Sequence, residues 1–424
     1  MRVLIVGGGG REHALAWKFK QEHPAVELIA APGNPGIAEL GECVPVAVSD
    51  IRALLALACD RQVDLTVVGP EGPLALGIVD TFRENGLPIF GPTRAAAEIE
   101  TSKAFAKQLM LDDGIPTARA EMHTSPTSAK AAAQRFGAPL VVKASGLASG
   151  KGVLVCETIK AAEAAIDDML EGGRFGDAGH EVLVEEFMEG EELSVFALTD
   201  GTSFLLLPGL QDHKRLLDGD RGPNTGGMGA YVPVSLPVGE GEVAAIVEST
   251  LRGMRERGRP FAGLLYAGLM ITRDGAKVVE FNCRFGDPET QALMPVLEVQ
   301  PGLLDVMFAI GAGQPLDAAS AEVHNACVTT VLAAANYPDS PRTGDVISVP
   351  AVPDGVTVFH AGTQRTADGQ LVTAAGRVLA VSAVGSSLDD ARARSLAVAQ
   401  RIQFEGKQLR TDIGWRESAR TSRN

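Results

Sequence analysis

The sequence predicts a multidomain protein of the α/β and α+β classes, with a parallel-sheet domain first and a small α+β domain last. Its 424 residues exceed one typical domain, and 45% of them are hydrophobic, so the chain can bury a large core. In the first hundred residues or so, apolar runs alternate with helical stretches, which is the pattern of a parallel sheet. Later strands and helices follow in blocks typical of α+β lobes.

The charge and cysteine content narrow the kinds of partner that the chain can have. A formal net charge of −15 argues against a general nucleic-acid surface, because phosphate backbones would be repelled except at local basic sites. The five cysteines form no CxxC pair, which fits a reducing cytoplasm better than a zinc site or a disulfide framework. The apolar run at residues 3–6 is too short for a signal peptide or a membrane span. We therefore expect a cytoplasmic protein without nucleic-acid or membrane partners.

The first domain is expected at residues 1–101. Its predicted strands lie at residues 3–6, 26–30 and 65–68, and its predicted helices at 50–59 and 74–85. The turns after the three strands lie at 7–11, 31–34 and 69–72, and they should gather at one edge of the sheet because parallel strands end at the same edge. Open parallel sheets bind ligands at that edge. The sequence therefore predicts a ligand-binding domain at the start of the chain.

Residues 7–13 read GGGGREH and lie between a predicted strand and a predicted helix. Glycines at such a place let backbone amides and a helix N-terminus approach an anion. A dinucleotide fingerprint would need a third glycine where Glu12 stands, and the acidic residue nearest the expected distance, Glu27, lies inside a strand. We expect a sugar phosphate or a similar anion here, with NAD and a purely structural turn as alternatives.

The middle of the chain, residues 102–325, is expected to form a second unit. Residues 102–111 predict a helix with Lys103 in its first turn, and residues 119–190 predict a compact α+β lobe. Further strands are predicted at 140–143, 152–156, 181–187, 192–199, 264–272 and 276–281, with a helix at 159–170. Residues 326–424 are expected to form the small α+β domain. Its predicted strands lie at 346–349, 356–360 and 377–384, before a helix at 388–403.

Residues 141–152 read VVKASGLASGKG and place Lys143 and Lys151 around a glycine loop. Two ammonium groups beside flexible backbone suit a triphosphate. A Walker A loop fits less well, because the stretch from Gly146 to Gly150 is one residue short and Gly152 stands where Ser or Thr should bind magnesium. Two solvated lysines beside a turn remain the structural alternative.

Residues 184–194 read VEEFMEGEELS, which predicts a strand, a tight turn and a second strand. By itself this pattern is more typical of a solvated acidic hairpin. Beside the lysine loop it could instead offer backbone N–H and C=O groups to an adenine edge, and a later carboxylate to ribose hydroxyls. Both interpretations stay open on these residues alone.

The sharpest feature is the segment 278–290, which reads VVEFNCRFGDPET. If its strand persists, the period of two puts Glu280, Asn282 and Arg284 on one face, with two oxygen ligands for Mg²⁺ and a guanidinium for phosphate. A buried salt bridge between Glu280 and Arg284 is the alternative. The segment therefore predicts a metal and phosphate site.

A glycine-rich segment at residues 209–231 contains QDHKR and then GPNTGGMGAY. Long loops of this kind are usually functional or disordered. His213 is a candidate general base, but a lone histidine is more often a hydrogen-bonded scaffold residue. No chemistry is therefore assigned to His213.

Together these motifs resemble the ATP-grasp superfamily, and their order closely resembles the phosphoribosylamine–glycine ligase family from end to end. The resemblance implies an ATP-grasp fold, preceded by a Rossmann-like parallel-sheet domain and followed by a small α+β domain. It also implies that 5-phosphoribosylamine, glycine and ATP give glycinamide ribonucleotide, ADP and phosphate through glycyl phosphate, in de novo purine biosynthesis. The implied cofactor is Mg²⁺ or Mn²⁺, ATP is a cosubstrate, and a monomer that binds small molecules is expected.

The resemblance also implies roles for individual residues. Arg284 and Lys143 are expected to be catalytic, and Glu280 and Asn282 to bind the metal. The residues expected to bind ATP are Lys103, Lys143, Gly146, Gly150, Lys151, Glu185, Glu186, Met188 and Glu192. Those expected to bind the other substrates are Gly9, Arg11, Glu12, Asn34, Glu71, Asp212, Lys214 and Asp287.

One departure from the wider superfamily reduces the expected number of metal ligands. Many members carry a further acidic ligand on the strand before the Glu-x-Asn strand, whereas residues 266–270 here read YAGLM. Phosphates and water would then supply more of the ligands, which Mg²⁺ tolerates. Two other functions remain as alternatives, namely an ATP-grasp ligase or carboxylase with another acceptor, and a nucleotide-binding protein without turnover.

Overall fold

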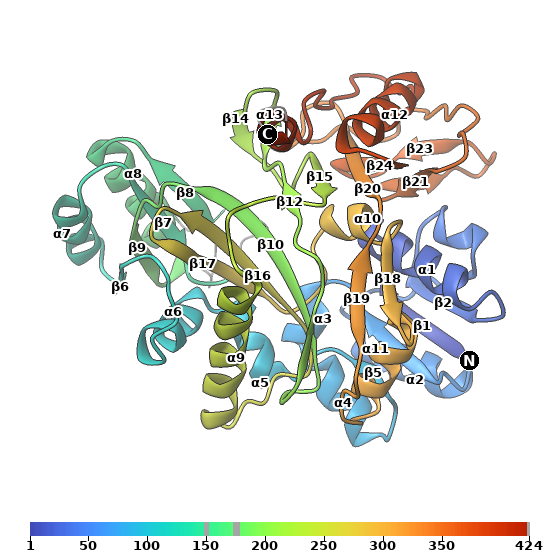
Figure 1. The fold of residues 1–424 in the computed structure, drawn as a ribbon, viewed down its shortest axis with the longest axis horizontal. Coiled ribbons are helices and arrows are strands. Elements are labelled where there is room, and N and C mark those ends of the chain that lie inside the picture. The colour runs from blue at the N-terminus through green and yellow to red at the C-terminus, as the bar shows by residue number, and fades with distance from the viewer. Residues whose placement is uncertain (148–151, 173–178, 422–424) are drawn as a thin grey trace.

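The structure, a computed structural model, describes residues 1–147, 152–172 and 179–421. Its elements form the multidomain α/β and α+β architecture that the sequence predicts (Figure 1). The blue N-terminal region and the red C-terminal region lie side by side, and the lobe of residues 119–186 projects on the opposite side. None of the helices in the described ranges is long and apolar enough to cross a membrane.

A five-stranded parallel sheet forms the N-terminal region, with the strand order β3-β2-β1-β4-β5. The strands are β1 (Arg2–Gly7), β2 (Glu27–Pro32), β3 (Glu42–Cys43), β4 (Leu65–Val68) and β5 (Ile89–Phe90). Val3, Leu4, Ile5 and Val6 have no solvent exposure, as expected for a central parallel strand that is covered on both faces. The strand order reverses at β1, so the turns after β1 and β4 meet at the carboxyl edge.

Helices cover this sheet and connect its strands. They are α1 (Gly10–Glu22), η1 (Ile37–Glu39), α2 (Ile51–Asp60), α3 (Glu71–Ala75), α4 (Ile78–Glu84) and α5 (Arg94–Thr101). The Asp50 carboxylate caps α2 by accepting the Ala53 N–H at 3.0 Å. The prediction of one helix at 74–85 is wrong, because Gly77 adopts a left-handed backbone (φ 85°) and separates α3 from α4.

Two antiparallel sheets form the middle of the chain, with the orders β6-β9-β7-β8 and β11-β10-β16-β17. Their strands are β6 (Ala120–His123), β7 (Leu140–Ala144), β8 (Val153–Cys156), β9 (Val182–Glu186), β10 (Glu191–Thr199), β11 (Phe204–Leu206), β16 (Gly263–Thr272) and β17 (Gly275–Asn282). The helices are α6 (Lys103–Asp112), α7 (Pro126–Phe136), α8 (Ile159–Leu170) and α9 (Glu240–Glu256). Because α7 and α8 share a separate core with the first sheet, this lobe projects as its own packing unit.

A five-stranded antiparallel sheet, ordered β12-β15-β20-β24-β21, forms the C-terminal region. Its strands are β12 (Gln211–Asp212), β15 (Gly229–Val232), β20 (Ala326–Ala333), β21 (Val356–His360) and β24 (Arg377–Gly385). The glycine-rich segment thus supplies two strands to the C-terminal sheet. The predicted strand at 346–349 is wrong, because only Val346 and Ser348 pair there, each in an isolated bridge.

The remaining elements are short or peripheral. They are β13 (Arg215–Leu217), β14 (Arg221–Asn224), α10 (Glu289–Leu293), β18 (Leu297–Gln300), α11 (Leu303–Gly311), β19 (Ser320–Val323), β22 (Thr363–Arg365), β23 (Leu371–Thr373), α12 (Leu388–Arg401) and α13 (Trp415–Thr421). One hydrophobic core contains Val3 of β1, Phe196 of β10 and Cys327 of β20. The N-terminal, central and C-terminal regions therefore share one hydrophobic core, which holds the residues at their junction in fixed relative positions.

Candidate active site

A cavity with a volume of about 400 Å³ collects side chains from all three regions of the chain. Its charged and amide lining groups are Arg11, Glu71, Glu100, Lys103, Lys107, Lys143, Glu185, Asp212, Lys214, Glu280, Asn282, Arg284, Asp287, Glu289 and Arg377. The lining therefore includes most of the residues singled out from the sequence. The expected site residues outside this lining are Gly9, Glu12, Asn34, Gly146, Glu186, Met188 and Glu192. Gly150 and Lys151 lie outside the described residues.

Two buried lysines share one buried carboxylate at the inner wall of the cavity. Lys143 of β7 and Lys107 of α6 place Nζ at 2.7 Å and 3.0 Å from the two carboxylate oxygens of Glu185 on β9. Burial raises the pKa of Glu185, but the two lysines lower it more, so the carboxyl is held ionised. Sequence reasoning missed Lys107, although its position one helical turn after Lys103 places both lysines on one face of the helix.

Lys103 begins α6 at the entrance to the glycine loop. Its Nζ donates to the carbonyl of Gly146 at 3.0 Å, and the Ser102 hydroxyl caps the helix by accepting the Phe105 N–H at 3.1 Å. Burial lowers the pKa of Lys103, and the nearby carboxylate of Glu280 opposes that shift. The helix cap and the loop carbonyl therefore hold a cation beside the cavity.

The expected nucleotide hinge follows β9 and is partly exposed. The Glu186 carboxylate accepts from Nε of the exposed Arg119 at 2.7 Å, and Met188 is partly buried. The Glu192 carboxylate, on β10, accepts from Lys214 Nζ at 2.5 Å. The side chain of Glu186 thus has a partner on the surface, and its backbone N–H donates to the Arg119 carbonyl at 3.0 Å.

The carboxyl end of β17 brings Glu280, Asn282 and Arg284 together, but not by the predicted strand geometry. The strand ends at Asn282, and Arg284 follows in a bend. Nη2 of Arg284 still lies 3.4 Å from Oδ1 of Asn282. Its ion-pair partners are Glu100 at 2.9 Å and Glu71 at 3.3 Å, so the alternative of a Glu280–Arg284 salt bridge is wrong.

Glu100, at the end of α5, fixes both the backbone and the side chain of this bend. One carboxylate oxygen pairs with Arg284, and the other accepts the Cys283 N–H at 2.7 Å and its Sγ at 2.9 Å. Burial lowers the pKa of the Arg284 guanidinium, but the Glu100 and Glu71 carboxylates raise it above its ordinary value. Sequence reasoning missed Glu100, because its partners Cys283 and Arg284 are more than 180 positions away along the chain.

The Glu280 carboxylate has no ion pair or hydrogen bond to another side chain in the described part of the chain. It lines the cavity next to the Asn282 amide and close to Lys103. Within the same ranges, no cluster of three or more His, Cys, Asp or Glu could hold a metal ion. A carboxylate and an amide oxygen are nevertheless donors that Mg²⁺ and Mn²⁺ bind. The donor set therefore fits an ion that takes its other ligands from phosphates and water.

A second polar group lies where β10, β12 and β16 meet. Nζ of Lys214 lies 2.8 Å from Oδ1 of Asp212. The Tyr266 hydroxyl lies 3.0 Å from the buried Glu289 carboxylate and 2.8 Å from the Ser194 hydroxyl. Burial raises the pKa of Asp212 to about 6; Lys214 opposes the shift and Glu289 adds to it. Sequence reasoning assigned no role to Tyr266 or to Glu289, although Glu289 lies within the segment 278–290.

Asp287 joins the N-terminal and C-terminal regions at the edge of the cavity. Nη1 of Arg377 lies 3.1 Å from its carboxylate, and the Arg11 backbone N–H donates to the carboxylate at 3.3 Å. The Arg11 guanidinium donates to the carbonyl of Phe285 at 2.8 Å. Burial raises the pKa of Asp287, but Arg377 and Arg11 lower it more. Arg377 is a further residue that the sequence did not reveal.

Glu12 and Asn34 in the first-domain turns are fully engaged inside the protein. Glu12 accepts the Gly9 N–H at 2.6 Å and Nε of Arg11 at 2.8 Å. The Asn34 amide donates to the carbonyls of Gly8 and His360, each at 2.9 Å. Its oxygen accepts the backbone N–H groups of residues 36 and 37. These side chains shape the turn instead of facing the cavity.

Family models match most of the chain. The N domain of phosphoribosylglycinamide synthetase matches residues 1–100, its ATP-grasp (A) domain residues 101–290 and its C domain residues 327–416. The chain is 52% identical to the phosphoribosylamine–glycine ligase of Xanthomonas campestris pv. campestris over 99% of each chain. The chain belongs to the phosphoribosylamine–glycine ligase family. The members of this family are ATP-dependent ligases of de novo purine biosynthesis.

Other relatives agree with this family and with its fold. The phosphoribosylamine–glycine ligase of Escherichia coli O6:H1 is 48% identical over 98% of each chain. The crystal structure of the Thermotoga maritima phosphoribosylamine–glycine ligase superposes with a TM-score of 0.86 at 34% identity, covering 97% of this chain and 100% of that one. A biotin carboxylase domain from Hydrogenobacter thermophilus has a TM-score of 0.72 at 17% identity, covering 96% and 91%, which shows the fold alone. The family and the ATP-grasp fold predicted from the motif order are confirmed.

Proposed function

We propose that this chain joins glycine to 5-phosphoribosylamine at the expense of ATP, giving glycinamide ribonucleotide, ADP and phosphate. The observation that carries the proposal is the convergence of Lys103, Lys143 and Arg284 on one cavity with Glu280 and Asn282. Three cations and two oxygen donors suit a polyphosphate with its metal ion. The family match over the full length selects the two other substrates. We further propose that the chain works in the cytoplasm as a monomer, without nucleic acid.

The reaction needs ATP because an amine does not displace the oxygen of a free carboxylate at a useful rate. In the proposed sequence, a glycine carboxylate oxygen attacks the γ-phosphorus and the bond to the ADP oxygen breaks. The amine of phosphoribosylamine then attacks the carbonyl carbon of glycyl phosphate. The carbon–oxygen bond breaks, phosphate leaves with that oxygen, and the amine loses a proton. The protein's task is therefore mainly to hold charged groups in line and to exclude water.

The phosphate-binding roles follow from the contacts in the cavity. Lys143 and Lys103 neutralise the ATP phosphates, and Arg284 stabilises the phosphoryl group in transfer. Glu185 orients Lys143, since it accepts from that ammonium at 2.7 Å. We assign the adenosine to the end of β9 and to Glu192, with Glu186 and Met188 acting through their backbone and the loop of Gly146, Gly150 and Lys151 completing the phosphate site.

We assign the metal to Glu280 and Asn282, with Mg²⁺ or Mn²⁺ as the ion. The Glu280 carboxylate lies beside an amide oxygen and has no side-chain partner among residues 1–147, 152–172 and 179–421, which supports this assignment. When bound, the ion would neutralise charge on the transferring phosphates. The chain's own part is to hold two oxygen donors next to Lys103 and Arg284.

We assign the ammonium of glycine to the acidic pair Asp212 and Glu289. Both carboxylates line the cavity, and Glu289 is 4% exposed. A buried carboxylate is stabilised by a cation, and Glu289 has only hydroxyl partners among the described residues. Lys214 would then hold Asp212 and contact the glycine carboxylate before its activation.

We assign phosphoribosylamine to the edge where the N-terminal sheet meets the cavity. Arg11, Glu71 and Asp287 line the cavity there. Gly9 and Asn34 would contribute through backbone groups of the turns, and Glu12 through its hold on Arg11. For the domains, we propose the boundaries 1–101, 102–325 and 326–424, with the strands β12 and β15 of the middle unit completing the C-terminal sheet.

The proposal is tested by measuring ADP release while each substrate is omitted in turn. We expect ADP only when ATP, glycine and phosphoribosylamine are all present with Mg²⁺. ADP formed with bicarbonate or formate in place of glycine would instead indicate another ATP-grasp ligase or carboxylase. Bound ATP without turnover under every combination would indicate a nucleotide-binding protein. Either result overturns the proposed reaction.

A further inference from the structure

His213 lies between the two residues of the QDHK segment that face the cavity. Asp212 and Lys214 both line the cavity, and side chains alternate along an extended segment, so His213 points to the other side. Its side chain is fully buried there. The His213 backbone N–H donates to the Gly229 carbonyl at 2.9 Å, and its carbonyl accepts the Met228 N–H at 2.8 Å, so both groups pair with the segment 228–229. The residue is therefore held from its backbone and from its ring.

The His213 ring contacts the C-terminal segment of the chain. Its Nε2 accepts the backbone N–H of Gly414 at 2.9 Å. Because Nε2 is the acceptor, the ring proton sits on Nδ1, which lies 3.6 Å from the Asp220 carboxylate. The His213 proton and the Arg410 guanidinium hold the pKa of Asp220 well below its ordinary value. The ring therefore links two segments that are about 200 positions apart.

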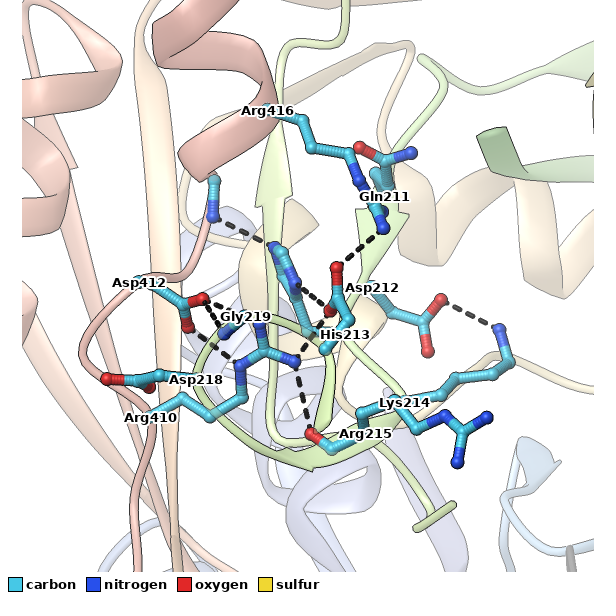
Figure 2. A network of polar contacts seen from close by, with 12 residues as sticks. Gln211, Asp212, His213, Lys214, Arg215, Asp218, Gly219, Arg410, Asp412 and Arg416 are labelled. Atoms are coloured by element: carbon cyan, nitrogen blue, oxygen red, sulfur yellow. Dashed lines mark hydrogen bonds and ion pairs between the residues drawn. The ribbon is translucent and has the colours of Figure 1, made fainter. Parts of the chain in front are cut away.

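Arg410 is the centre of the same contact network (Figure 2). Its side chain has no solvent exposure, and its guanidinium donates to the Asp220 carboxylate at 2.9 Å and to the Arg215 carbonyl at 3.1 Å. The Asp412 carboxylate accepts two of its N–H groups and the Gly219 N–H. Charge-assisted bonds of this kind are stronger than neutral ones. Figure 2 shows Asp212 and Lys214 extending away from this network.

We propose that His213 is a positioning residue that holds Asp212 and Lys214 in place by anchoring their segment to residues 410–414. The inference rests on the proposed function, because it assigns those two residues to glycine. The segment needs such an anchor, since the sequence that follows is rich in glycine and gives little side-chain packing. Holding the pair before glycine arrives removes an ordering cost from binding. His213 acts without touching a substrate.

The test compares His213→Ala with His213→Gln. The glutamine carboxamide oxygen can still accept the Gly414 N–H, whereas alanine cannot. The matched control is Ser395→Ala on α12, which removes buried hydrogen bonds to Thr330 (2.8 Å) and to the Val381 carbonyl (2.7 Å) but leaves the contact between His213 and Gly414 in place. Steady-state kinetics with glycine and with ATP would be measured on the full chain, together with amide hydrogen exchange of residues 211–217 in the ligand-free protein.

We expect His213→Ala to raise the KM for glycine by roughly five- to thirtyfold and to speed amide exchange in 211–217. The KM for ATP should change much less, because the proposed adenine hinge lies on β9. His213→Gln should restore most of the glycine KM, and Ser395→Ala should leave it unchanged. A glycine KM that stays constant in His213→Ala, or that rises equally in Ser395→Ala, overturns the proposal.

Steady-state kinetics and amide exchange test the proposed function and the anchoring separately. A wild-type protein that releases no ADP with glycine contradicts the proposed function. Amide exchange in 211–217 does not depend on turnover, so it tests the anchoring by His213 even in that case. Unchanged exchange in His213→Ala contradicts the anchoring even where glycine-dependent ADP release is present.

Discussion

The N-terminal turns and the end of β17 look alike in sequence but use their polar side chains in different ways. Both follow a buried strand with glycines, carboxylates and an arginine. In the turns, the side chains of Glu12 and Asn34 form hydrogen bonds with backbone groups and with Arg11. At β17, the Glu280 carboxylate faces the cavity without a protein partner in the described ranges.

This difference separates residues that shape the site from residues that act in it. A side chain whose donors and acceptors are all engaged is costly to remove but has nothing left for a ligand. A partly buried carboxylate without a partner is costly to keep unless a ligand or an ion compensates it. We therefore expect cavity substitutions to reduce activity more than stability, and turn substitutions to do the reverse.

The largest expected effect is the loss of activity in Glu280→Gln. Removing a proposed metal ligand should lower kcat/KM by roughly a thousandfold, equivalent to about 4 kcal/mol. The free energy of unfolding should not fall, because the carboxylate makes no hydrogen bond or ion pair to another side chain in the part of the chain that the structure describes. Steady-state ADP release and urea unfolding provide the two measurements. Glu322→Gln on β19, whose side chain is 68% exposed, is the matched control; an inactive control or an active Glu280→Gln would remove the distinction.

The second-largest expected effect is a loss of stability in Glu185→Gln. Glu185 lines the cavity, but its carboxylate is paired with protein side chains. Glu185→Gln leaves Lys143 and Lys107 buried without their shared carboxylate, which should lower the free energy of unfolding by about 3 kcal/mol. Urea unfolding measures it. The control is Glu186→Gln. Glu186 pairs with an Arg119 side chain that is 75% exposed, so this variant should lower the free energy of unfolding by about 1 kcal/mol or less. Equal losses of stability in Glu185→Gln and Glu186→Gln would contradict the interpretation of Glu185 as a structural partner of the lysines.

The third effect is a pH dependence that Asp212→Asn removes. The folded pKa of Asp212 is about 6, whereas an unfolded aspartate titrates near about 3.9. The folded protein binds the extra proton between these values, so stability falls as the pH rises through them, by about 2 to 3 kcal/mol. Urea unfolding at pH 4 and pH 7 should therefore show a change in the free energy of unfolding that is less favourable to the folded state in the wild type than in Asp212→Asn, by that amount.

Asp287 gives the opposite sign and serves as the control for that titration. Arg377 and Arg11 depress its folded pKa, so its contribution to stability is present above the unfolded pKa and is lost as the pH falls. In Asp287→Asn, the loss of stability toward acid should therefore be smaller than in the wild type. Identical pH profiles of the wild type and Asp212→Asn would show that Asp212 is not the group that titrates.

The smallest effect is expected for Asn34→Ala, which removes the amide that ties the first-domain turns to His360. The free energy of unfolding should fall by about 1 to 2 kcal/mol, because buried backbone groups lose their partner. Asn85→Ala is the control, since the Asn85 amide makes one exposed bond to the Thr81 carbonyl. Should Asn34→Ala leave stability intact and instead raise the KM for phosphoribosylamine, its side chain would bind substrate directly.

The fold was largely predictable where local pattern decides it. The continuous apolar run of β1 and the Asp50 cap of α2 follow from residue type and spacing. The break at Gly77 was not predicted, because an isolated glycine inside a helical pattern is often tolerated. Nor was the membership of β12 and β15 in the C-terminal sheet, because strand partners that lie far apart leave no local signal.

The motifs predicted many of the residues that line the candidate site, but not the residues that pair with them. The period of two grouped Glu280 with Asn282 correctly as lining residues, yet it could not foresee that the strand ends before Arg284. The pairing of Arg284 with Glu100 depends on tertiary contacts over more than 180 positions. Lys107 is the exception, since helical spacing from Lys103 would have revealed it.

The measurement that most directly tests the proposed ligation follows the oxygen atoms of glycine. With ¹⁸O in both carboxylate positions, the attack on the γ-phosphorus and the later loss of phosphate transfer one labelled oxygen to the phosphate product. Mass spectrometry of that phosphate should find one ¹⁸O per molecule formed, and the other ¹⁸O in the amide of the product. Phosphate that carries no label while the amide forms would contradict the glycyl phosphate pathway.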